Sequence, residues 1–390
     1  MQVQPRFWEA RTDVPKKTKM NVAIACGGTG GHLFPGLAVA EQLRRDGHDV
    51  LILVSKKDVD QHASDFDSSL PIVRIPAIGM PRRKVSFAMI AFACKLFASI
   101  CICQLRYMRH RTDVVLGMGG FTSAAAVLAA QLHFIPTVIH ESNSIPGKAN
   151  LWAARHAKFA ACGFNACIER FPKGKGVWTG TPVRNSLREL PRQEAVERLD
   201  LDTKKPTVLV MGGSQGAHAL NQATMEACPD IKDFNLIHLT GAEDLQLAND
   251  VYKGAGFPAC VQPFLREMEL AYSAADIVVS RAGAASLTEI AHYRLPSILV
   301  PYPLAAENHQ QRNAEIFEKA GTAMIVTQDK LTGQSLAQAV RNLWNNEERR
   351  RRMAERLVSL QKPNASSEVV QLLKLAAKFQ PIGQPSEVAA

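Results

Sequence analysis

Cysteine is scarce in this sequence and follows no pattern. Eight cysteines occur in 390 residues, none of them in a C-x-x-C pair, and no group of histidines has the spacing of metal ligands. We therefore expect no metal site and no disulfide framework, and a reducing cytosol is the simplest compartment. The first 19 residues also lack the apolar core of a secretory signal peptide, so we interpret residues 1–19 as an N-terminal extension.

Two common phosphate-binding motifs are missing as well. No string of the form G-x-x-x-x-G-K-[ST] occurs, which disfavours a P-loop nucleoside triphosphatase. A dinucleotide-binding G-x-G-x-x-G counted from Gly28 would place Leu33 at its last glycine, and Ser55-Lys56-Lys57 stands where the acidic residue that binds ribose is expected. NAD binding is therefore disfavoured, and we expect no cofactor.

Acidic residues are absent between positions 74 and 111. This stretch contributes +8 to a net charge of +10 and surrounds the most apolar segment of the chain, residues 85–103. A nucleic-acid-binding protein more often mixes its cations with polar and aromatic residues, so we expect no nucleic acid. Cations beside an apolar segment favour an anionic membrane surface as partner. The basic residues are Arg74, Arg82, Arg83, Lys84, Lys95, Arg106, Arg109 and Arg111.

The rest of the composition, with 46% hydrophobic and 21% charged residues, is that of a globular protein of two or three domains. The apolar run 22–26 leads into the glycine turn GGTGGH (27–32), a helical pattern and the apolar run 50–54, which together predict a βαβ unit. A second strand is followed by GGSQGA (212–217), which starts 185 residues after the first turn. We therefore predict an α/β fold of two Rossmann-like, doubly wound domains facing a cleft.

The glycine turns and a few polar residues are the candidates for chemistry. A glycine turn between a parallel strand and a helix lets the backbone approach a phosphate, although such a turn can also be merely tight. His32 could take a proton from an attacking hydroxyl, or it is an ordinary exposed loop histidine. Glu289 either accepts hydrogen bonds from a ribose or caps its helix together with Ser286. Glu141 and Asn143 follow a strand at the edge where α/β proteins bind ligands, or are simply solvated.

The chain resembles the MurG family of glycosyltransferases, which have the two-domain GT-B fold, in six segments taken together: GGTGGHLFPGLAVAEQL, GMGGFTS, HESN, GTPVR, GGSQGA and AGAASLTEIA. The match runs in order from about Met20 to Lys378. It implies an inverting hexosyltransferase of peptidoglycan synthesis that moves N-acetylglucosamine from UDP-N-acetylglucosamine to undecaprenyl-diphosphate-N-acetylmuramoyl-pentapeptide (lipid I), giving lipid II. It also implies a peripheral protein on the cytoplasmic face of the plasma (inner) membrane.

The resemblance further implies roles for single residues. His32 would activate the acceptor hydroxyl or organise the diphosphate, Glu289 would bind the ribose, and Gln310 would bind the sugar. Gly119, Gly120 and Glu141 would contact the acceptor, and no metal is implied. The donor site would consist of Thr29, Gly30, Gly31, Asn143, Arg184, Ser214, Leu265, Ala284, Ala285, Ser286, Leu287, Thr288, Glu289 and Gln310.

The same resemblance divides the chain into parts. An acceptor- and membrane-binding domain would occupy residues 20–182 and a UDP-sugar-binding domain residues 183–365. A C-terminal helix at 366–380 would pack back on the N-terminal domain, and residues 381–390 would form a tail.

The apolar segment 85–103 would be about 28 Å long as a helix, nearly enough to cross a bilayer. A single crossing would place the two glycine turns on opposite sides of the membrane. We therefore favour a helix lying in the membrane interface over a transmembrane or a buried helix, and Lys95, Ser99 and Arg106 fall on one side of it. The alternatives for the whole chain are another UDP-sugar enzyme of the same fold, such as a glycolipid glycosyltransferase or a UDP-N-acetylglucosamine 2-epimerase, and a membrane-docked sugar-nucleotide-binding module without turnover.

Overall fold

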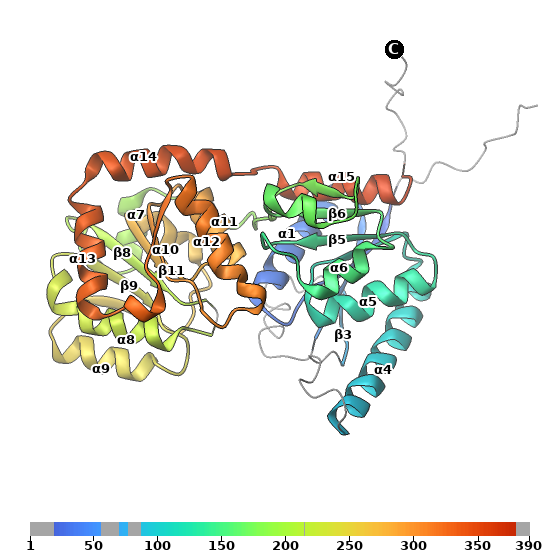
Figure 1. The fold of residues 1–390 in the computed structure, drawn as a ribbon, viewed down its shortest axis with the longest axis horizontal. Helices are drawn as coiled ribbons and strands as arrows, with labels where there is room; N and C mark the ends of the chain where they lie inside the picture. The colour runs from blue at the N-terminus through green and yellow to red at the C-terminus, as the bar shows by residue number, and fades with distance from the viewer. Residues whose placement is uncertain (1–18, 56–69, 77–86, 214, 380–390) are drawn as a thin grey trace, which may run out of the picture.

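The computed structural model describes residues 19–55, 70–76, 87–213 and 215–379, which form two α/β domains side by side (Figure 1). Within these residues the N-terminal domain has a parallel seven-stranded sheet in the order β3-β2-β1-β4-β5-β6-β7. Its strands are β1 Asn21–Ala25, β2 Asp49–Val54, β3 Ile72–Arg74, β4 Val114–Gly117, β5 Thr137–Glu141, β6 Phe159–Cys162 and β7 Gly176–Trp178. Its helices are α1 Gly30–Arg45, α4 Phe87–His110, α5 Gly120–Leu132 and α6 Lys148–Ala154, with a 3₁₀ helix at Asn165–Arg170.

The C-terminal domain repeats this plan. Its described residues form a parallel six-stranded sheet in the order β10-β9-β8-β11-β12-β13, with helices on both faces. The strands are β8 Thr207–Met211, β9 Asn235–Leu239, β10 Ala259–Gln262, β11 Ile277–Ser280, β12 Ser297–Leu299 and β13 Ala323–Ile325. The helices are α7 Arg192–Arg198, α8 His218–Ala227, α9 Leu245–Gly254, α10 Met268–Ala274, α11 Ala284–His292, α12 His309–Lys319, α13 Gly333–Trp344 and α14 Glu347–Leu357. The predicted pair of Rossmann-like domains is confirmed.

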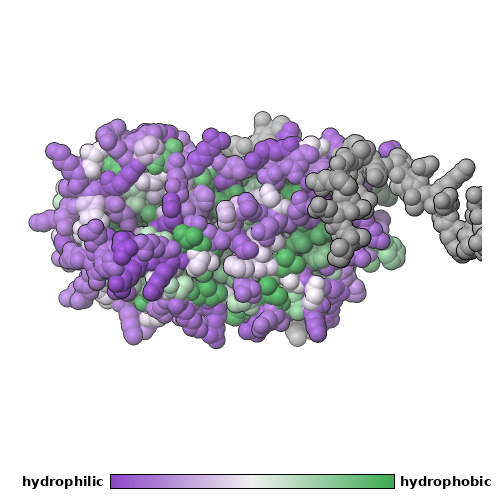
Figure 2. Space-filling view, turned by 90° about the horizontal axis from the view of Figure 1, so that it is seen from above, coloured by the Kyte–Doolittle hydropathy of each residue, from purple (hydrophilic) through white to green (hydrophobic). Residues whose placement is uncertain are grey.

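The central strands are apolar throughout because helices cover both faces of each sheet. In β1, Val22 and Ile24 belong to the core cluster that contains α1, whereas Ala23 and Ala25 belong to the cluster under α4 and α5. All four side chains are completely buried. Toward solvent, hydrophilic residues cover most of the face seen in Figure 2, and hydrophobic residues show only in small groups there.

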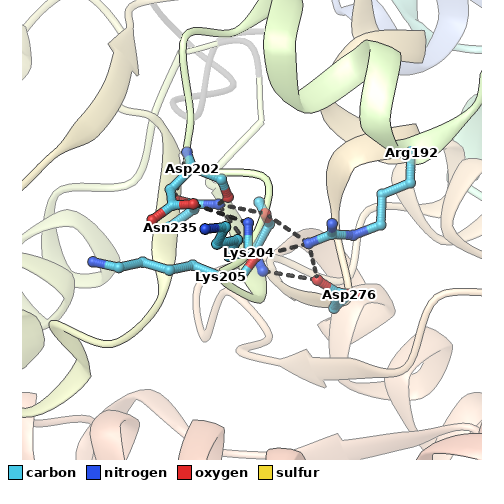
Figure 3. A network of polar contacts seen from close by, with 7 residues as sticks. Arg192, Asp202, Lys204, Lys205, Asn235 and Asp276 are labelled. Atoms are coloured by element: carbon cyan, nitrogen blue, oxygen red, sulfur yellow. Dashed lines mark hydrogen bonds and ion pairs between the residues drawn. The ribbon is translucent and has the colours of Figure 1, made fainter.

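A polar network fixes the amino-terminal edge of the C-terminal sheet (Figure 3). The Arg192 guanidinium of α7 donates to Asp276, just before β11, at 2.8 Å, and the same carboxylate oxygen accepts from the backbone N–H of Thr207 on β8. The Asn235 side chain on β9 donates to the carbonyl of Asp202 at 2.7 Å. Three neighbouring strands are thereby joined at the edge that faces away from the loops at their carboxyl ends.

The last helix, α15 (Ala365–Ala376), returns to the N-terminal domain and packs on α1 and beside β4, β5 and β6 (Figure 1). Val369, Val370 and Leu373 lie in the same core cluster as Val22 and Ile24. The chain therefore crosses between the domains twice. The two crossings touch each other, because a Cβ on Gly180, whose φ is +76°, would overlap Lys362.

Helix α4 has two different faces. Its inner face carries Ser99, Cys103 and Tyr107, which are buried against α5 and the sheet, and the Tyr107 hydroxyl donates to the carbonyl of Ala126 at 2.9 Å. The sequence predicts that Lys95, Ser99 and Arg106 fall on one side of this helix and suit binding in the membrane plane. Ser99 does not fit that role, because it is completely buried and its hydroxyl donates to the Lys95 carbonyl, whereas Lys95 and Arg106 are exposed. The segment 77–86, which contains Arg82, Arg83 and Lys84, lies outside the described residues.

The packing of α15 predicts a stability effect. Leu373→Ala should lower the free energy of unfolding by about 2–5 kcal/mol, because it opens a cavity in the N-terminal core. Leu375, on the same helix, has 63% of its surface exposed, and Leu375→Ala should change stability by less than about 0.5 kcal/mol. Urea denaturation of both variants measures the difference; equal effects would mean that α15 does not complete the N-terminal core.

Candidate active site

The first glycine turn brings His32 against the second. Gly28 has a φ of +85°, the exposed Thr29 is the N-cap of α1, and His32 lies in the first turn of that helix. A Cβ on Gly119, whose φ is +98°, would lie 3.0 Å from Cε1 of the His32 ring, so only glycine fits there. Gly120, also against the ring, begins α5. One imidazole thus lies where two helix N-termini meet, each with a partial positive charge.

Glu141, at the end of β5, organises the loop that follows it. Its carboxylate is buried and accepts four hydrogen bonds, from the backbone and the side chain of Asn143, the backbone of Gly147 and the side chain of Asn150. The Asn150 amide also lies next to Gly119. Because both carboxylate oxygens are engaged by the protein, the observed role of Glu141 is to hold this loop.

The C-terminal domain contributes a second, more buried group of polar residues. Glu289 on α11 accepts a 2.7 Å hydrogen bond from the Tyr272 hydroxyl, and its burial raises the pKa of the carboxyl, against the opposing influence of Tyr272 and of the Arg184 charge. Arg184 is buried and lies over the ring of Phe34, 4.4 Å from its centroid. Phe34 belongs to α1, so this contact joins the segment between β7 and α7 to α1. Helix α1 also touches α11.

Most of the remaining donor-site candidates follow strands of the second sheet at its carboxyl edge. The first turn of α11 consists of Ala284, Ala285 and Ser286, and the Thr288 hydroxyl donates to the Ala284 carbonyl. Leu287 is completely buried, so only its backbone can face a ligand. Leu265 follows β10 and packs on the domain core, and the Gln310 side chain accepts from the backbone of Tyr302. Gly30 is buried and Gly31 half-buried at the start of α1, and Ser214 lies outside the described residues.

A side chain that the sequence analysis missed connects the two halves. Asn313 of α12 is completely buried and accepts from both the backbone and the hydroxyl of Ser144, each at 2.9 Å. Its amide nitrogen donates to the Asn143 side chain at 3.1 Å and to the Ala282 carbonyl at 3.2 Å. Lys148 and Glu307 add an exposed ion pair across the same junction. We call this set of contacts around Asn313 the clasp.

A polar chain behind the GGSQGA turn was also missed, although His218 follows that turn directly. Asn221 donates to Asp244 and to the Thr240 carbonyl, so its oxygen must accept from Nε2 of His238. The other nitrogen of His238 then accepts from the Tyr252 hydroxyl, and His218 donates to Asp244 at 2.9 Å. Backbone packing of Gly216 against Thr240 and Gly241 joins this chain to the turn.

No group of three or more metal-ligating side chains occurs in the part of the chain that the structure describes. What the two facing edges offer instead is hydrogen-bond donors, helix N-termini and buried charges. Such an arrangement can hold a diphosphate without a metal and can move a proton at His32.

Solved glycosyltransferase structures share this architecture. The crystal structure of MurG from Acinetobacter baumannii superposes with a TM-score of 0.69 at 30% identity, over 91% of this chain and 99% of that one. A UDP-N-acetylglucosamine 2-epimerase superposes with a TM-score of 0.67 at 11% identity, which shows a shared fold alone. Two Rossmann-like domains whose carboxyl edges meet at one polar site define the GT-B class.

The family follows from the sequence comparisons. The N-terminal domain of glycosyltransferase family 28 matches residues 22–162, and the C-terminal domain of that family matches residues 207–369. This chain belongs to glycosyltransferase family 28. A UDP-N-acetylglucosamine–N-acetylmuramyl-(pentapeptide) pyrophosphoryl-undecaprenol N-acetylglucosamine transferase of Desulfotalea psychrophila is 36% identical over 90% of this chain and 95% of its own length. The protein of the same name from Anaeromyxobacter dehalogenans is 35% identical over 94% and 97%.

Two buried histidines predict how stability depends on pH. Burial lowers the pKa of His140, which donates to the Gly180 carbonyl, and that of His238 to about 4 each. The unfolded chain binds protons at these residues below about pH 6.5, whereas the folded chain does so only near pH 4. The contribution of these two histidines to the free energy of unfolding should therefore be constant above pH 6.5. It should fall between pH 6.5 and 4, by up to about 3 kcal/mol for each histidine.

The check is a series of melting temperatures from pH 7.5 to 4 for the wild type and a His140→Gln/His238→Gln variant. The variant should be less stable at neutral pH but should lose less stability on acidification. Parallel curves would show that these histidines do not cause the acid sensitivity.

Proposed function

We propose that this chain transfers N-acetylglucosamine from UDP-N-acetylglucosamine to lipid I, giving lipid II, by an inverting single displacement. The observation that carries the proposal is the position of His32 between the N-termini of α1 and α5, together with the half-buried Glu289 carboxylate, which feels the Arg184 charge. Relatives that carry this activity in their names match nearly the full chain.

In the proposed donor complex the C-terminal domain binds uridine diphosphate. The half-buried Glu289 carboxylate accepts hydrogen bonds from the ribose, beside the Tyr272 hydroxyl that already orients it. The backbone at Leu265 and at Ala284–Thr288 lies along the nucleotide. Arg184 neutralises charge on the phosphates, and Ser214 donates a hydrogen bond to them. Thr29, Gly30, Gly31 and Asn143 approach the diphosphate and sugar from the N-terminal domain, and Gln310 binds the sugar.

The proposed reaction is one displacement at the anomeric carbon. The acceptor hydroxyl oxygen bonds to C1 of N-acetylglucosamine as the bond from C1 to the diphosphate oxygen breaks, and the electron pair of that bond leaves with UDP. His32 takes the hydroxyl proton. The N-termini of α1 and α5 and the Arg184 charge stabilise the negative charge that develops on the diphosphate. Because Gly119 and Gly120 have no side chains, the acceptor can approach His32 closely.

This mechanism predicts a large effect at His32. His32→Ala should lower turnover by about 10²–10⁴-fold while the affinity for UDP changes little, because the proposed ribose contact lies in the other domain and the backbone of the glycine turn is unchanged. The assay measures transfer of labelled N-acetylglucosamine to lipid I, with UDP binding followed by calorimetry. His156→Ala, at an exposed histidine between α6 and β6, is the matched control and should behave as wild type. Normal turnover of His32→Ala at saturating substrate would exclude His32 as the base.

A peripheral position on an anionic membrane is also proposed, and α4 supports it. The segment Met89–His110 is long and apolar enough to cross a bilayer by length and composition. Its inner face, however, belongs to the core cluster that contains β1 and β2, so it could not cross without unfolding the domain. Its outer face presents an apolar stripe with Lys95, Arg106 and Arg109 exposed on the same helix; the stripe consists of Ile90, Cys94, Phe97, Cys101, Leu105 and Met108.

Such a face fits a helix lying in the membrane interface. Phe97 has 69% of its surface exposed, and Phe134, in the turn after the neighbouring α5, has 95% exposed. The lysine and arginine side chains can reach the headgroups while the stripe enters the acyl boundary. We place this docking on the cytoplasmic face of the plasma membrane, where the lipid acceptor would be presented to the cleft.

The stripe can be tested directly. Replacing Ile90, Phe97 and Met108 together by serine should reduce binding to anionic phospholipid vesicles by at least about ten-fold, because each loses apolar surface that the lipid would cover. Transfer to a short, water-soluble acceptor should be unaffected. Leu304→Ser, at a leucine of the C-terminal domain with 79% of its surface exposed, is the control and should bind vesicles normally. Unchanged sedimentation of the triple variant with vesicles would place docking elsewhere.

A further inference from the structure

A groove of about 370 Å³ crosses the junction between the domains beside the clasp. One wall comes from the loop after β5 and from the 3₁₀ helix Asn165–Arg170, and the other wall from α12. None of the residues in this groove belongs to the proposed donor site or to the proton transfer at His32. Its lining residues are Ser144, Ile145, Ala166, Arg170, Arg312, Glu315, Ile316 and Lys319.

The groove is cationic. Glu315 is its single acidic residue, and it is bound by Arg312 at 3.1 Å and by the Gln311 amide at 3.2 Å. No carboxylate of the described residues lies within 4.0 Å of the charged groups of Arg170 or Lys319. These two cations lie on opposite walls, one in each domain. The apolar residues Ile145 and Ile316 line the same two walls. A ligand that suits such a groove is a short chain with apolar parts and a negative end.

The loop after β5 lines the groove and is also held by residues of the acceptor half of the active site. Ser144 follows Asn143 directly, and the Glu141 carboxylate holds this loop together with Asn150, which lies against Gly119 and thus beside His32. The loop that lines the groove is therefore linked to the His32 ring through Glu141, Asn150 and Gly119. Five residues of extended peptide span at most about 17 Å.

We propose that this groove binds the peptide of the acceptor and that Arg170 and Lys319 hold its terminal carboxylate. The inference rests on the proposed function, which supplies an acceptor carrying a pentapeptide. A pentapeptide ends in a carboxylate, and carboxylates pair with guanidinium and ammonium groups. Because the walls belong to different domains, a bound peptide would also add contacts across the junction in the same place as the clasp.

The test measures the wild type and a double variant, each with two different acceptors. The variant Arg170→Gln/Lys319→Gln should raise KM for lipid I about three- to ten-fold, as expected for two partly exposed charge pairs, with kcat and KM for the donor unchanged. An acceptor whose peptide ends in a carboxamide should show the raised KM already with the wild type, and the variant should raise it no further. Lys232→Gln/Lys253→Gln removes two exposed cations of the C-terminal domain outside the groove and should match the wild type.

Two outcomes would overturn the proposal. An unchanged KM for lipid I would show that the groove takes no part in acceptor binding, and an equal rise with both acceptors would show that it does not recognise the carboxylate. Weaker UDP binding by calorimetry would instead mean that the cations serve a phosphate of the donor. If the wild type transfers nothing to either acceptor, the proposed function fails, and calorimetry with lipid-free muramoyl pentapeptide still decides whether the groove binds peptide.

Discussion

One buried amide, that of Asn313, links the facing edges of the two domains through side-chain hydrogen bonds. It makes four hydrogen bonds, two from Ser144 and one each to Asn143 and the Ala282 carbonyl, so neither its oxygen nor its nitrogen has capacity left over. Loss of any of these partners would leave a buried polar group unsatisfied, at a cost of about 1–3 kcal/mol. Asn313 thus helps to hold the domain of His32 against the domain of Glu289, although it has no part in the proposed proton transfer or ribose contact.

Some polar groups of the site hold the protein's own loops, and others lie at the facing edges of the two domains. Glu141, Tyr272 and Asp244 make their hydrogen bonds inside the protein and hold loops in place. The facing edges also carry the N-termini of α1 and α5, with the half-buried His32 ring between them. Buried carboxylates and neutral histidines thus provide a rigid frame, and the accessible parts can meet charge as it develops on a substrate.

The sequence predicted the parts of this protein that depend on local patterns. Strand Asn21–Ala25, the turn at Gly27–His32 and the helix after it follow from apolar runs and glycines that are neighbours in the chain. The sequence did not predict contacts between residues that are far apart in the chain. Asn313 and Ser144 are separated by 169 positions, and Asn221 meets Asp244 only through the pairing of β8 with β9. Ser99 was misplaced because a helical pattern that is apolar all round does not reveal which face is covered.

The position of α15 has a consequence for how the chain is made. The described strands and helices of the C-terminal domain lie between residues 192 and 360, whereas the N-terminal core lacks Val369, Val370 and Leu373 until α15 has been synthesised. During translation the C-terminal domain can therefore close its core while the domain that was synthesised first still exposes an apolar strip over α1. The usual order, in which domains complete themselves from the N-terminus onward, is reversed. In the interval before release from the ribosome, that strip is a surface a chaperone could occupy.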